Sequence, residues 1–179
     1  NHQWLLYSTP FEEALKRNPK LRYMCLVDFD CNLLIRLVGK VKTKQLKKFM
    51  TRVAELHQTA KALHVTTPAG TDVTFRLDPT HVISNDCGDA SKPGMHFLTG
   101  QLNVIPDFSS TNGTIVFDGT ITPPFGKIPD APVILTVKKG KIIKIEGGRA
   151  AREYEQWLDS FQDENMLRMA HIAYGFNPG

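Results

Sequence analysis

The chain has 179 residues, of which 41% are hydrophobic and 22% are charged, so it is long enough for one large domain, or for one domain and part of another, with a real core. The patterned apolar residues exclude an intrinsically disordered chain, and no apolar run predicts a membrane span or a signal peptide. The net charge is +4, and the lysines within residues 40–48 and 138–144 have no interleaved aromatic residues, which indicates solvated faces and no nucleic-acid partner. Three cysteines without a C-x-x-C pair predict reduced thiols in a cytoplasmic protein.

The first third of the chain has the pattern of an α/β layer. Thr9 and Pro10 predict a helix start, because threonine can cap a helix and proline suits its first position. Residues 22–29 predict a buried strand, and residues 43–63 predict the clearest helix of the chain. The apolar residues expected on the buried side of that helix are Leu46, Phe49, Met50, Val53, Leu56, Ala60 and Leu63.

From residue 64 the pattern changes to short strands and turns. A first hairpin is predicted over residues 64–77, and a second over residues 133–146 with Gly140 in the left-handed position of its turn. Between them, residues 114–117 predict a buried strand. Asn112-Gly113 and Asp118-Gly119 bracket this strand, and both dipeptides predict turns because they tolerate positive φ. A helix with Trp157 on its apolar face is expected over residues 149–161, followed by a strand over residues 169–174.

These elements predict an α+β protein, in which the end of an α/β layer is followed by a β-rich domain of hairpins with a packed helix. We expect residues 1–63 to be the C-terminal part of an N-terminal α/β domain and residues 64–179 to be the β-rich domain. The chain begins without a methionine and stops directly after a strand-like run. We therefore expect a fragment, with the second domain truncated at residue 179.

Five segments of the β-rich part resemble, in the same order, motifs of the thermophilic metallo-aminopeptidases (the aminopeptidase T and S family). Several motifs in the right order are far more specific than any single one. The segments are Gly70-Thr71-Asp72, Phe97-Leu98-Thr99-Gly100-Gln101, residues 112–119 (NGTIVFDG), residues 137–148, and residues 170–178 (AHIAYGFNP).

Two positions depart from the peptidase pattern. In the peptidases, the second and the last of these segments each supply a glutamate to a two-metal site, but here the positions read Gln101 and His171. A neutral amide cannot bridge two cations or balance their charge. The departures instead resemble another branch of the superfamily, the 2,5-dihydroxypyridine dioxygenases. Their one ferrous iron is held by two histidines and one carboxylate, which leaves open positions for substrate and oxygen.

This resemblance implies a mononuclear non-haem iron enzyme that uses Fe²⁺ and dioxygen to open a small hydroxylated aromatic or pyridine ring. His171 is expected to bind the metal, although a core histidine in a strand would be the simpler interpretation of that residue alone. The family's remaining His-x-Asp pair would lie beyond Gly179. Gln101 is expected to hydrogen-bond the substrate or a metal-bound water, and His96 to line the pocket. The family also implies a homo-oligomer.

Two alternatives stay open at this point. One is a metallo-aminopeptidase with altered ligands, which would use Zn²⁺ or Co²⁺ to release amino acids from short peptides. The other is a non-catalytic relative, in which the fold is retained for binding or assembly after the metal site has decayed. The second alternative predicts a complete protein without stoichiometric metal.

Overall fold

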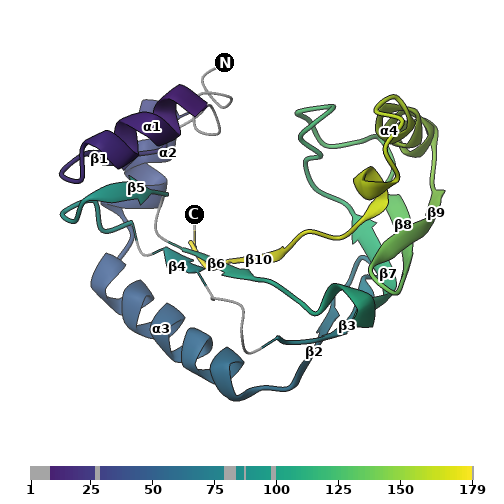
Figure 1. Cartoon of the computed structure of the whole chain (residues 1–179), viewed down its shortest axis with the longest axis horizontal. Helices are drawn as coiled ribbons and strands as arrows, with labels where there is room; N and C mark the ends of the chain where they lie inside the picture. Colours follow the sequence, from purple (N-terminus) through teal and green to yellow (C-terminus); the bar gives the residue numbers. More distant parts are fainter. Residues whose placement is uncertain (1–8, 27–28, 79–83, 87, 98–99, 179) are drawn as a thin grey trace. The chain divides into compact units, whose positions relative to one another are not determined.

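The computed structural model describes residues 9–26, 29–78, 84–86, 88–97 and 100–178, and these form the predicted α+β structure (Figure 1). The chain divides into two compact units. The first contains residues 1–59, 82–104 and 173–179, and the second contains residues 60–81 and 105–172. The domain boundary expected between residues 63 and 64 stays a prediction. Within the described ranges, no helix is long and apolar enough to cross a membrane.

The second unit is built on an antiparallel sheet of five strands in the order β2-β3-β7-β8-β9 (Figure 1). Both predicted hairpins are present: β2 pairs with β3, and β8 pairs with β9. Gly140, with a φ of 73°, takes the left-handed position predicted for the second turn. The strands are β2 (Ala62–Thr66), β3 (Asp72–Arg76), β7 (Asn112–Phe117), β8 (Val133–Lys138) and β9 (Lys141–Glu146).

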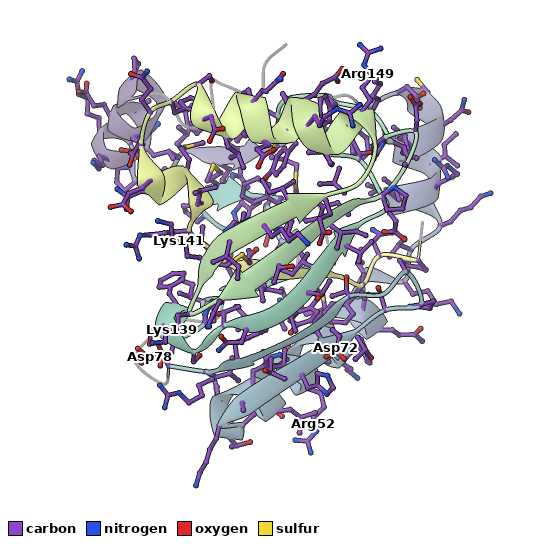
Figure 2. All side chains as sticks on the ribbon, turned by 90° about the vertical axis from the view of Figure 1, so that its right-hand side faces the viewer. Arg52, Asp72, Asp78, Lys139, Lys141 and Arg149 are labelled. Carbon is purple, nitrogen blue, oxygen red and sulfur yellow. The ribbon has the colours of Figure 1, made fainter. Side chains whose placement is uncertain are left out.

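One face of this sheet carries the core of the second unit. Strand β8 alternates buried with partly buried residues, so that Val133, Leu135 and Val137 share the buried face. Helix α4 (Arg149–Asp159) covers this face with Ala151 and Leu158, both of which are buried. The helix is followed by the short 3₁₀ helix η4 (Glu164–Leu167). Figure 2 shows Arg149 at the start of α4, and Lys139 and Lys141 at the turn side of the β8–β9 hairpin.

The first unit contains two smaller sheets. Strand β1 pairs in parallel with β5, and a second sheet has the order β10-β6-β4. Met50 of helix α3 is fully buried in this unit, together with Leu102 and Val104 of β6. The elements are α1 (Thr9–Arg17), β1 (Arg22–Met24), α2 (Cys31–Leu34), the π-helical turn η2 (Ile35–Gly39), α3 (Thr43–Thr59), β4 (Ser84–Asp86), β5 (Gly94–His96), β6 (Gln101–Val104) and β10 (Ile172–Gly175).

Several predicted elements have different bounds in the structure. Helix α3 ends at Thr59 because the next residues pair with β3 as strand β2, and Phe49 and Leu56 on its apolar side remain 53% exposed. The strand predicted over residues 22–29 covers only residues 22–24, with residues 27–28 outside the described part. The last strand begins at Ile172, so His171 precedes the strand that was expected to contain it.

The turn predicted at Asn112-Gly113 is wrong, because both residues belong to strand β7. Gly113 pairs with Val73 on one side and with Val137 on the other. A Cβ atom at Gly113 would lie 2.2 Å from the carbonyl oxygen of Asp72. Glycine is needed here for the close approach of a neighbouring strand and not for a turn.

Thr71, just before β3, is hydrogen-bonded to strand β7. Its side-chain oxygen accepts a hydrogen bond from the Val116 N–H (3.0 Å), and its hydroxyl donates to the Val116 carbonyl (3.4 Å). Thr71 is only 8% exposed. Replacing it with valine therefore leaves a buried N–H without its acceptor, which costs more than a water-exposed hydrogen bond would.

We expect Thr71→Val to lower the free energy of unfolding by about 2 kcal/mol, because an unpaired buried donor carries its full desolvation penalty. Thr71→Ser keeps the hydroxyl and is expected to lose about half as much, since only a methyl group is removed. Urea unfolding followed by circular dichroism measures both variants. Equal stability of the valine variant and the wild type would contradict the role assigned to this hydroxyl.

Candidate functional site

A cavity of about 320 Å³ lies in the second unit, between the sheet, helix α4 and the segment at residues 166–172. Small-molecule pockets in proteins begin at about this volume and are mostly apolar, with a few polar groups that orient the ligand. The cavity has this composition. Its apolar wall includes Val65, Val73, Ile115, Phe117, Leu135 and Met169.

His171 lines this cavity and is exposed. The segment before it is held to the β8–β9 hairpin by a hydrogen bond from the Met169 N–H to the Gly140 carbonyl (2.9 Å), and by a β-bridge between Arg168 and Lys141. Within the described residues, neither ring nitrogen of His171 has a hydrogen-bond partner. The imidazole is therefore free to bind a ligand or a metal through one nitrogen.

Three other polar side chains line the cavity, and they differ in what they can still bind. The Thr71 hydroxyl is already used within the sheet. Arg168 donates from Nε to the Asn165 side-chain oxygen (3.0 Å). Burial raises the pKa of Tyr154, so its phenol stays protonated at neutral pH and remains a hydrogen-bond donor.

Gln101 and His96, the other predicted site residues, lie in the first unit. Gln101 is the first residue of β6, and its side-chain amide donates to the Asn103 side-chain oxygen (2.9 Å). His96 is the last residue of β5, and its Nε2 lies 2.9 Å from the Lys92 carbonyl. These two residues lie in different sheets, and His171 belongs to the other unit. Their roles at a shared site stay predictions.

The structure brings together the two segments that carried the departures from the peptidase pattern. Strands β6 and β10 are neighbours in one sheet, and the Phe176 N–H donates to the Gly100 carbonyl (2.7 Å). Gly100 has a φ of 120°, and a Cβ atom there would lie 2.7 Å from the Asn177 nitrogen. Only glycine allows this approach. The backbone just before Gln101 therefore packs directly against Asn177, which follows β10.

The described residues do not form a complete metal site. No three histidine, cysteine, aspartate or glutamate side chains among them lie close enough to share an ion. His171 supplies one nitrogen donor of the type that iron and zinc accept. Among the described residues, His171 is the histidine that lines this cavity.

His57, interpreted from the sequence as structural, packs in the first unit. Its Nδ1 lies 2.8 Å from the Val53 carbonyl, and its ring lies 5.5 Å from the ring of Tyr174. Burial raises the pKa of Tyr174. These contacts belong to the packing of α3 against β10 and not to the cavity.

Sequence reasoning did not single out Tyr154 and Arg168 as cavity residues. Tyr154 lies on the apolar face of the helix, where it is expected to be core. Its phenol oxygen could have indicated a binding position, because a tyrosine on an apolar face carries a polar group that needs a partner or a ligand. Arg168 had no such signal, since only the folded path of residues 166–172 brings it to the cavity.

Comparison with known proteins gives a consistent result. Residues 2–179 match the family model described as NicX: 2,5-dihydroxypyridine 5,6-dioxygenase. The 2,5-dihydroxypyridine 5,6-dioxygenase of Pseudomonas putida KT2440 is 29% identical to the chain over 177 residues, which are 97% of this chain and 49% of that protein. The chain thus spans about half the length of this curated relative.

Solved structures show the same relationship. The structure of 2,5-dihydroxypyridine dioxygenase from Pseudomonas putida KT2440 matches 95% of this chain and 48% of its own, with a TM-score of 0.75 and 26% sequence identity. Wild-type AmpT from Thermus thermophilus matches 94% of this chain and 40% of its own, with a TM-score of 0.59 and 16% identity. At that identity the second match shows a shared fold alone.

Proposed function

Because the chain belongs to the NicX family of 2,5-dihydroxypyridine 5,6-dioxygenases, we propose that the protein of which it is part is a ring-cleaving dioxygenase. Its substrates are a small hydroxylated aromatic or pyridine ring and dioxygen. The observation that carries the proposal is the family match over residues 2–179, which includes the segments around Gln101 and His171.

The structural support comes from the cavity beside His171. Its volume of about 320 Å³ suits a single small ring, and its apolar wall suits the faces of such a ring. The imidazole has no partner among the described residues, so a ligand does not have to displace an existing hydrogen bond. The imidazole is thus one of the few polar groups that can orient a ligand in this apolar cavity.

We propose that His171 supplies one ligand to a mononuclear ferrous iron, and that the other ligands lie outside the described residues. Gln101 hydrogen-bonds the substrate or a water, as its neutral amide can both donate and accept. We also propose that His96 lines the pocket of the full-length protein. Zn²⁺ or Co²⁺ is the metal of the alternative, a peptidase.

A cytoplasmic location and a homo-oligomeric state also belong to this proposal. Of the three cysteines, Cys25 and Cys31 are free thiols in the structure. Free thiols are the rule in reducing compartments, which supports the cytoplasm.

Metal content of the full-length protein tests the proposal. The protein is purified without oxygen and offered ferrous iron, zinc and cobalt in competition. We expect one iron per chain, and oxygen uptake when 2,5-dihydroxypyridine is added. Two zinc or cobalt ions per chain, with release of amino acids from short peptides, would contradict the proposal and support a peptidase. A full-length protein without stoichiometric metal would support the non-catalytic alternative.

A further inference from the structure

Tyr154 packs against two aromatic side chains at the cavity wall, and its hydroxyl is not used by any residue that the structure describes. Its ring stacks on Trp157 with centroids 5.9 Å apart, and it meets the edge of Phe117 at 6.2 Å. Both contacts fix the plane of the ring. The hydroxyl has no hydrogen-bond partner within the part of the chain that the structure describes. A rigid phenol with a free O–H at an apolar cavity is a preorganised donor for a ligand.

Arg168, an exposed residue, also lines this cavity and carries a second set of donors. Its Nε donates a hydrogen bond to the Asn165 side-chain oxygen. The pKa of Glu164 is lowered chiefly by the hydrogen bond and charge of Lys141, and to a smaller extent by the charge of Arg168. The terminal guanidinium nitrogens have no hydrogen-bond partner among the described residues. The backbone of Arg168 is fixed by the bridge to Lys141, so its side chain starts from a defined position.

The rest of the cavity recognises only apolar surface. Phe117 and Met169 contribute a ring and a thioether, which suit the faces of an aromatic ring. Thr71 lines the cavity, but its hydroxyl is already hydrogen-bonded to the backbone of Val116. The available polar groups are therefore Tyr154, Arg168 and His171, and only His171 has a place in the proposed metal site.

We propose that Tyr154 and Arg168 select for ring substrates that carry a hydroxyl or hydroxylate, by hydrogen-bonding that oxygen while the ring lies against Phe117 and Met169. The class of ring rests on the proposed function. The assignment of the oxygen contact to these two residues does not rest on it. It follows from an apolar wall and two side chains in one cavity whose donors have no partner among the described residues. Both donors favour an oxygen acceptor, and the cation also favours a negative one. His171 lines the same cavity, so a ring bound in this way lies beside the proposed metal ligand.

Ligand binding to metal-free, full-length protein tests this inference apart from catalysis. Calorimetric titration in the presence of a chelator compares meta-hydroxypyridine with unsubstituted pyridine. We expect the wild type to bind the hydroxylated ring about tenfold more tightly, the value of one good hydrogen bond. Tyr154→Phe and Arg168→Gln should each reduce this preference about threefold and leave the affinity for pyridine unchanged. Tyr154→Phe keeps the ring contacts, so the variant should fold normally.

Matched variants outside the cavity serve as controls. Tyr23→Phe removes a phenol oxygen from strand β1, where the ring packs against Phe11. Arg152→Gln removes a cation from the exposed side of α4. Both should bind the two probes like the wild type.

Each outcome separates the inference from the proposed function. The inference would be overturned if Tyr154→Phe and Arg168→Gln both kept the wild-type preference for meta-hydroxypyridine over pyridine. It would also be overturned if the wild type bound neither probe. Ring cleavage that proceeds normally in both cavity variants would also count against it while leaving the dioxygenase proposal intact. Reduction of the preference in the variants, in a protein that consumes no oxygen with any ring, would support the binding site and count against the dioxygenase.

Discussion

Replacing His171 with alanine in the full-length protein is expected to lower kcat/KM for ring cleavage by more than a hundredfold, because the variant loses a group proposed to bind the metal. Changes to residues that only support metal ligands already cost about 10- to 100-fold, so removal of a ligand should cost more. His171 is exposed and precedes strand β10. Its truncation should therefore leave the fold intact.

Two measurements accompany this variant. Iron content per chain should fall together with the activity, and the urea unfolding midpoint should stay near that of the wild type. His64→Ala is the matched control, since His64 is an exposed histidine on strand β2 whose Nε2 lies 2.8 Å from Asp72. It should keep both iron and activity. Full activity in His171→Ala would exclude this histidine as a ligand.

Gly113→Ala is expected to give the largest loss of stability, about 3 kcal/mol or more, because two costs add at this position. Its φ of 134° lies where side chains are rarely tolerated. An added Cβ would also lie 2.2 Å from the Asp72 oxygen and 2.8 Å from the Val73 Cα. Both contacts are with backbone, so relief requires β3 and β7 to move apart.

Gly119→Ala is the matched control for this change. Gly119 follows β7, is exposed, and has no atom within 4 Å of where a Cβ would stand. Its substitution should change the free energy of unfolding by less than about 0.5 kcal/mol, as is usual at the surface. Urea unfolding of the two variants compares them directly. Similar small losses would contradict the close pairing of β3 with β7.

This pair of glycines also shows where prediction from the sequence reaches its limit. Both follow a polar residue at an end of the same apolar run, so local chemistry cannot tell them apart. What distinguishes them is the neighbouring strand β3, which pairs with Gly113 from about forty positions earlier in the sequence. Gly140 was predicted correctly because its turn is set by the adjacent residues alone.

The candidate site divides in the same way. His171 and Gln101 were found because each replaces a residue within a recognisable motif. Tyr154 and Arg168 were not: Tyr154 was interpreted as a core residue of its helix, and Arg168 reaches the cavity only through the folded path of residues 166–172. The apolar side of α3 was also overestimated: its period predicted seven buried residues, but Phe49 and Leu56 remain half exposed. Periodicity predicts which side is apolar, and packing decides how much of that side is covered.

Isotopically labelled dioxygen tests the central proposal most directly. The full-length protein, supplied with ferrous iron and 2,5-dihydroxypyridine under labelled dioxygen, should form a ring-opened product in which mass spectrometry finds both labelled atoms. That result would establish a ring-cleaving dioxygenase. An unlabelled product, or no ring opening by a protein that instead hydrolyses short peptides with zinc or cobalt, would contradict the account.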